Sequence, residues 1–166
     1  MRNLMVICAL LTLACATPVL AESTRPVEVE FVNAEKFTDV SERNFRTRPE
    51  RNHHLHSLRK YLETRAVRHL APGQSLKIEF TDIDLAGDFR PQIDPALHDV
   101  RLVTRLYPPR LEFNYVLSDA SGVTLNSGAA KLRDIGFDMH SSGNSSDALR
   151  FEKRLLAKWM RDKFGG

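Results

Sequence analysis

The stretch "SLKIEFTDIDLAG", residues 75–87, decides the character of the fold. Its first half alternates apolar with polar residues, and this period of two predicts a β-strand whose inward residues are Leu76, Ile78 and Phe80. If the pleat continued unbroken, Asp82 and Asp84 would face the same apolar side. Because unpaired buried carboxylates are costly, two alternatives follow: a bulge near Thr81–Asp82 that restores the apolar face, or two inward carboxylates.

Similar alternation occurs before and after this stretch. "VEVEFV" (27–32), "VRLVTRLY" (100–107) and "RLEFNYVL" (110–117) each read as a strand. The turn "SDASG" (118–122) leads into "VTLNSGAAKL" (123–132), which predicts a β-hairpin with the strand before it. The sequence therefore predicts five strands.

Two segments instead have helical periodicity. "TRPE" (47–50) resembles a capping box with Thr47 as the cap, and it predicts a helix that ends at "APG" (71–73). The apolar stripe of this helix is Leu55, Leu58, Leu62, Ala66, His69 and Leu70. A second helix over about 148–164 has an apolar face made by Phe151, Leu155, Leu156, Trp159 and Phe164.

The element order is thus β-α-β-β-β-β-α. Short turns between consecutive strands favour a mostly antiparallel sheet, and two amphipathic helices on one face give an α+β two-layer sandwich. The helical crossover makes the first two strands the expected parallel pair. We expect one domain over residues 22–166, with its core at about 27–164.

The first 21 residues have the pattern of an export signal. A short basic start precedes "LMVICALLTLACA", and cleavage is expected after Ala21. Both cysteines, Cys8 and Cys15, lie in this segment, so the mature chain would carry no disulfide and no thiolate. We expect a periplasmic protein without a transmembrane segment; the alternative is a lipoprotein lipidated at Cys15.

Positive charge gathers in the two predicted helices. Residues 43–69 hold eight Arg and Lys against two Glu, and residues 149–164 hold six against two acidic residues. This pattern predicts a basic helical layer that binds an envelope protein or an anionic membrane surface. Its candidate binding residues are Arg59, Lys60, Arg65, Arg68, Arg154 and Lys158. Nucleic acid is not an expected partner, because no basic patch is interleaved with aromatic residues.

The acidic stretch is a poor match to a calcium loop. An EF-hand that began at Asp82 would need oxygen ligands at its fifth and twelfth positions, which here are Ala86 and Ile93. "HHLH" (53–56) offers His53 and His56 as weak metal candidates, but zinc usually takes three or four ligands. We therefore expect no metal and no cofactor.

No phosphate-binding loop, dinucleotide fingerprint or G-x-S-x-G elbow is present. A non-catalytic envelope accessory is the first functional hypothesis. The alternative is a small metal-dependent or hydrolytic enzyme that uses Asp82, Asp84, Asp88 and His140. A third possibility is an oligomer built through an exposed sheet edge.

Several stretches, including "FTDIDLAGDFRP", "DVRLVTRLYPPRLEFNYVLSDASG" and "LRFEKRLLAKWMRDKF", resemble the bacterial family called domain of unknown function 3016. The similarity covers about residues 27–164. It implies an exported protein of Gram-negative bacteria and carries over no catalytic residue. Its motif segments contain Asp82, Asp84, Gly87, Tyr107, Pro108, Pro109, Arg110, Arg133 and Asp134. We expect structural roles for most of these, with Asp82 or Asp84 pairing with Arg110 or Arg133 at a sheet end.

Overall fold

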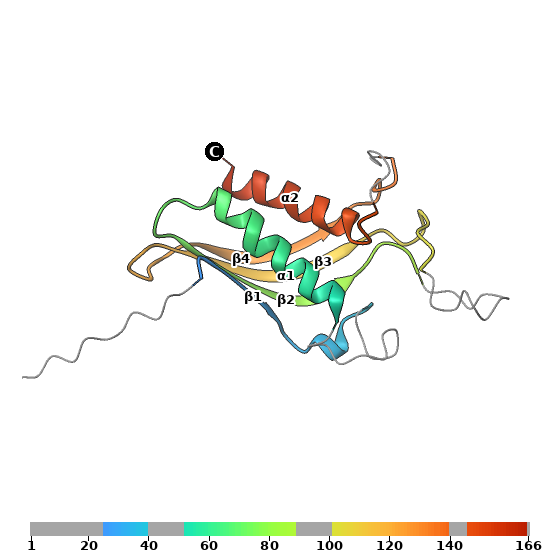
Figure 1. Ribbon diagram of the computed structural model, residues 1–166, viewed down its shortest axis with the longest axis horizontal. Helices are drawn as coiled ribbons and strands as arrows, with labels where there is room; N and C mark the ends of the chain where they lie inside the picture. The colour runs from blue at the N-terminus through green and yellow to red at the C-terminus, as the bar shows by residue number, and fades with distance from the viewer. Residues whose placement is uncertain (1–24, 40–51, 89–100, 140–145, 166) are drawn as a thin grey trace, which may run out of the picture.

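Two helices cover one face of a four-stranded sheet (Figure 1). The computed structural model describes residues 25–39, 52–88, 101–139 and 146–165. The expected signal segment 1–21 lies outside these ranges. The α+β two-layer fold predicted from the sequence is confirmed, and neither described helix has the length and apolar character needed to cross a bilayer.

The sheet has the order β1-β2-β3-β4. The strands are β1 (Val27–Phe31), β2 (Ser75–Asp84), β3 (Arg110–Ser118) and β4 (Thr124–Arg133). Strands β1 and β2 are parallel, as a helical crossover between them requires. Strands β2, β3 and β4 are antiparallel neighbours, and β3 with β4 forms the predicted hairpin. Strands β1 and β4 are therefore the two edges.

Of the two alternatives for the end of β2, the structure has the bulge near Thr81. Phe80 pairs with Phe113 and Asp82 pairs with Glu112, so the register shifts between Phe80 and Asp82. Past the shift, Ile83 pairs with Leu111, and both side chains are fully buried. One extra residue thus returns the apolar side chains to the core and turns Asp82 and Asp84 toward the other face.

Helix α1 spans His53–Arg65 and continues into the short 3-10 helix η3 (Ala66–His69). It begins later than predicted: its N-cap is Asn52, whose side chain accepts hydrogen bonds from the backbone N–H groups of His54 and Leu55. The capping box predicted at Thr47 lies outside the described residues, and the described helix is capped by Asn52 instead. His69 is only half-buried, outside the core stripe in which it was expected.

Helix α2 spans Arg150–Phe164, close to the prediction. Its aromatic side chains fill the core between helix and sheet: the Trp159 ring packs edge-on against Phe113, Tyr115 and Phe164. Phe113 also contacts Phe80, which stacks on Phe31. A line of aromatic rings therefore runs from β1 across the sheet to α2, and joins the two layers.

The strand predicted over 100–107 is not formed in the described part of that segment. Leu102 makes an isolated bridge with Asp88, and the residues that follow are turn and coil. The side chains of Leu102 and Val103 are exposed, so the alternation "VRLVTRLY" does not mark a buried face. The prolines at 108 and 109 have no N–H group with which to extend a ladder.

Candidate functional site

Two regions gather most of the charged residues that the sequence singled out. The first, which we call the polar clasp, lies at the end of β2 and comprises Asp39, Asp82, Asp84, Arg101, Arg110 and Glu152. The second, which we call the basic groove, lies between β4 and α2. In the polar clasp the charged side chains pair with one another, whereas in the basic groove positive charge is in excess.

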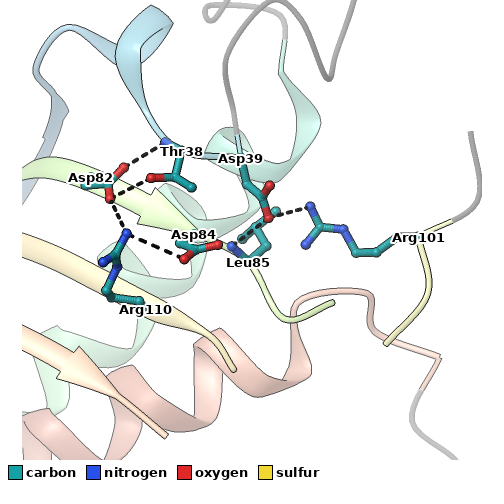
Figure 2. A network of polar contacts seen from close by, with 7 residues as sticks. All are labelled: Thr38, Asp39, Asp82, Asp84, Leu85, Arg101 and Arg110. Carbon is teal, nitrogen blue, oxygen red and sulfur yellow. Dashed lines mark hydrogen bonds and ion pairs between the residues drawn. The ribbon is translucent and has the colours of Figure 1, made fainter. Parts of the chain in front are cut away.

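Arg110 is the centre of one half of the polar clasp. Its guanidinium lies 3.3 Å from an Asp82 carboxylate oxygen and 3.6 Å from one of Asp84 (Figure 2). Asp82 also accepts hydrogen bonds from the backbone N–H and the hydroxyl of Thr38, at 2.8 and 2.9 Å. Of the two expected arginine partners, Arg110 pairs with both Asp82 and Asp84, whereas Arg133 pairs with neither among the described residues. The Asp82 contacts tie the segment after β1 to the end of the sheet.

Asp39 and Arg101 make the other half. The Asp39 carboxylate accepts from the Leu85 backbone N–H and from Arg101, both at 3.0 Å (Figure 2). Arg101 also donates to the Ala86 carbonyl at 3.2 Å. Burial raises the pKa of Asp39, although the Arg101 charge acts to lower it. These contacts fix residues 84–86 from two sides.

A buried carboxylate from α2 completes the clasp. Glu152 is 1% exposed, and one of its carboxylate oxygens accepts from the Ala86 N–H at 2.7 Å. Its other oxygen has no hydrogen-bond partner among the described residues. Burial raises the pKa of Glu152, and burial followed by the Asp39 charge raises the pKa of Asp84. The clasp therefore holds three carboxyl groups whose pKa is raised by burial: Asp39, Asp84 and Glu152.

The motif glycine is fixed by close backbone packing. Gly87 has φ +91, and a Cβ at this position would lie 2.5 Å from the Leu102 carbonyl oxygen. Its N–H donates to the carbonyl of Tyr107 at 2.9 Å. Pro108 and Pro109 are buried beside it. The two motifs around Gly87 and Tyr107 thus meet in space and act as one structural unit.

The described residues of the alternative, enzymatic hypothesis do not line either of the two cavities. Asp82 and Asp84 are paired with Arg110, and neither of the cavities at the basic groove and beside β1 is lined by Asp82, Asp84 or Asp88. His140 lies outside the described residues. Within the described ranges, no group of three or more His, Cys, Asp or Glu could hold a metal ion.

The histidines of α1 are also placed without convergence on a metal. His53 and His56 are exposed in the first turns of the helix. The ring of His54 lies 3.8 Å from that of His53, and burial together with the His53 charge lowers the pKa of His54 to about 4. His54 therefore stays neutral at pH 7.

The basic groove is a cavity of about 540 Å³ at the edge of the sheet. Its floor is apolar and is made by Leu132, Leu155 and Trp159. Six cationic residues line it, against the two acidic residues Asp134 and Asp162; the cations are Lys131, Arg133, Arg154, Lys158, Arg161 and Lys163. Its volume is in the range of ligand-binding pockets, about 300–1,000 Å³, and its charge suits an anionic ligand.

Part of this positive charge is compensated within the protein. Lys131 pairs with Glu112, Arg154 with Asp134, and Lys158 with Asp162. By contrast, Arg133 and Arg161 form no ion pair with any described residue, and Lys163 lies over the Tyr115 ring. The groove therefore has uncompensated positive charge beside an apolar floor, and both acidic residues in its lining already have partners.

The predicted basic layer is divided by the fold. Arg154 and Lys158 line the groove, together with Arg133 and Asp134 from the family motifs. Arg59 instead donates to the Val29 carbonyl at 3.3 Å and lies over the Phe31 ring, so it supports β1. The three remaining candidates are exposed on α1 and η3, away from the groove: Lys60, Arg65 and Arg68.

The sequence reasoning missed Lys131, Arg161 and Lys163 in the groove and Glu152 in the clasp. The sequence did contain a signal that Glu152 would be buried. This residue stands three, four and seven residues before Leu155, Leu156 and Trp159, so it shares their apolar helical face. The groove cations had no such signal. Strand β4 and helix α2 are separate in sequence, and only their packing brings these cations together.

Comparison with known proteins gives one informative result. The family model described as Protein of unknown function (DUF3016) matches residues 25–162. A comparison with curated proteins and another with solved structures give no match. The match spans the whole sheet and nearly all of α2, including the polar clasp and every residue of the basic groove except Lys163. The chain therefore belongs to the DUF3016 family, as its "TDIDLAG" and "YPPR" motifs predicted.

Proposed function

We propose that this protein is a non-catalytic accessory of the bacterial envelope that binds an anionic partner through the basic groove. The observation that carries the proposal is the composition of the groove, where six cationic residues and two acidic ones surround an apolar floor. Such a surface attracts anions over a range set by the ionic strength, and its apolar floor adds contact area once the partner is bound.

The basic groove is better suited to bind an anionic partner than the predicted basic helical layer taken as a whole. Four of the groove cations belong to α2, and Lys131 and Arg133 flank the same cavity on the edge strand β4, whereas the exposed cations of α1 and η3 do not line it. Converging charges act on one bound anion together, and scattered surface charges are screened individually by salt. We therefore assign binding to the groove and ordinary solvation to Lys60, Arg65 and Arg68.

The experiment compares two variants from which the same amount of charge is removed. The groove variant carries Arg133→Gln, Arg161→Gln and Lys163→Gln, and the matched control carries Lys60→Gln, Arg65→Gln and Arg68→Gln. Binding to polyglutamate is measured by titration across a salt series. We expect the groove variant to lose at least tenfold in affinity at low salt, and the control to lose less than threefold. Equal losses in the two variants would refute the assignment to the groove.

The location in the periplasm is part of the same proposal. It is supported by the signal pattern of residues 1–21, with cleavage expected after Ala21. Mass spectrometry of the protein isolated from cells would find a chain that begins at Glu22 if the signal is cleaved there. A lipid-modified chain that begins at Cys15 would establish the lipoprotein alternative instead.

A further inference from the structure

We propose that the anionic partner is an extended acidic segment of another protein, which adds to the outer edge of β4 as a fifth strand. This inference rests on the proposed function, and it adds the class of the partner and its binding mode. Strand addition uses the main-chain hydrogen bonds of an exposed sheet edge for affinity and alternate side chains for specificity.

Among the described residues, strand β4 pairs with another strand on one side only. It has ten residues, of which only Ala130 is buried, and Leu125 is 51% exposed. It is the last strand of the sheet, so no described strand pairs with its outer edge. A long exposed edge presents backbone N–H and C=O groups to any extended chain.

The opposite edge of the sheet is less suited to strand addition. Strand β1 has five residues, and the carbonyl of Val29 already accepts a hydrogen bond from Arg59 of α1. Glu28 and Glu30 give this strand acidic side chains. An acidic segment would therefore be repelled at β1 and attracted at β4, where Lys131 and Arg133 stand on the edge strand itself.

The basic groove lies where the side chains of an added strand would project. A strand paired with β4 would lie about 4.8 Å from it and would alternate its side chains between the two faces of the sheet. Those on the helical face would contact the apolar floor at Leu132 and Trp159, within reach of the cations Arg161 and Lys163. Those on the other face would lie beside Arg133, which stands opposite Arg110 across the hairpin. The fitting segment alternates apolar with acidic residues.

The concave shape of the site favours a segment of chain over a membrane surface. The apolar floor lies between a strand and a helix, and its Trp159 and Leu155 side chains are each 8% exposed. A narrow chain can enter such a groove and contact this floor. A flat layer of lipid headgroups would contact only the cations on the rim, and it would leave the backbone edge of β4 without partners.

The experiment uses a ten-residue peptide of alternating glutamate and valine, matched in length to β4. A second peptide has the same sequence with N-methyl groups on the amides of both its valines and its glutamates, which keeps every side-chain charge and removes the backbone donors on both edges of the strand. A third replaces glutamate with lysine. Affinities for the purified protein are measured at low salt, together with hydrogen exchange of the β4 amides.

We expect the first peptide to bind and to slow exchange in β4. We also expect the N-methylated and lysine peptides to bind at least tenfold more weakly, and the groove variant to lose at least tenfold for the first peptide. Equal affinity of the N-methylated peptide, with unchanged exchange in β4, would overturn strand addition while the anionic groove stands. If the protein bound anionic vesicles but no peptide, and the groove variant did not bind the vesicles, the partner would be a membrane surface. That result would overturn this inference but not the proposed function. Failure to bind polyglutamate, peptide and vesicle alike would refute the proposed function itself.

Discussion

The polar clasp and the basic groove contain the same residue types but differ in how their charges are used. In the clasp, Asp39 and Asp82 face Arg101 and Arg110 and also accept backbone or hydroxyl donors. In the groove, Arg133 and Arg161 meet no described carboxylate partner, and cations outnumber acids. Charge that is paired and bonded to the backbone holds the fold together, whereas uncompensated charge around an apolar floor is available to a ligand. The comparison predicts that clasp variants lose stability and groove variants lose binding.

The largest effect is expected at Gly87. A Cβ there would meet the Leu102 carbonyl oxygen at 2.5 Å and the Val103 Cα at 2.9 Å, in a backbone with φ +91. Gly87→Ala should lower the free energy of unfolding by about 2–4 kcal/mol, from backbone strain and overpacking. The control is Gly122→Ala, because Gly122 has φ +82 but no atom within 4 Å of its Cβ position. Equal losses in urea unfolding would show that packing at the clasp is unimportant.

A smaller loss is expected when the buried carboxylate is removed. Glu152→Ala leaves the Ala86 N–H without its acceptor and creates a cavity, which should cost about 1–3 kcal/mol. Glu152→Gln keeps an acceptor oxygen at the same position and should retain most of the stability at pH 7. Thermal unfolding of both variants measures these changes in stability. A Glu152→Ala variant as stable as the wild type would show that Glu152 does not stabilise the clasp.

The same residue gives a pH dependence with a defined sign. Burial raises the pKa of Glu152 above its ordinary 4.5, so the folded state retains a proton that the unfolded state releases. Its contribution to stability is complete below pH 4.5 and is lost as the pH rises through the raised pKa. Glu152→Gln should therefore become more stable relative to the wild type as the pH increases above 4.5. The pKa of His54 is lowered to about 4, so this residue makes the folded state less stable as the pH falls below 6.5. The wild type and the Glu152→Gln variant both contain His54, so its effect cancels when they are compared.

The ion pairs of Arg110 should contribute less, because its side chain is 42% exposed. Asp82→Asn weakens one pair and two bonds to Thr38, and about 1 kcal/mol is expected. Asp84→Asn affects only the longer pair, so about 0.5 kcal/mol is expected. Melting temperatures would rank the two variants, and an unchanged value for Asp84→Asn would exclude a stabilising role for that pair.

The smallest effect on stability is expected in the groove. Arg133→Gln, Arg161→Gln and Lys163→Gln each replace a side chain on an exposed residue, and each should change the free energy of unfolding by less than about 0.5 kcal/mol. Urea unfolding would measure this directly. A loss comparable to that of Glu152→Ala would mean that the groove cations are structural, and the contrast with the clasp would disappear.

Residue pattern alone predicted much of the fold. The alternation in β2 and the position of Asp82 predicted either a bulge or two inward carboxylates. The structure has the bulge, because a one-residue shift keeps both Ile78 and Ile83 in the core. The strand expected at 100–107 failed for a related reason. Its alternation was genuine, but a period of two does not show whether a core is available for one of its faces, and Leu102 and Val103 remain exposed.

Sequence by itself determined the two-layer class and the family, and it reduced the end of β2 to two alternatives and the partner of Asp82 or Asp84 to Arg110 or Arg133. Each of these features depends on local periodicity or on short motifs that can be read directly along the sequence. Only the tertiary structure decided which cations share a cavity, that Glu152 of α2 bonds to Ala86, and that β4 is an open edge. Those features join segments far apart in the chain, and their positions are set by how a helix packs on a twisted sheet. Charge counts along a sequence contain no information about that packing.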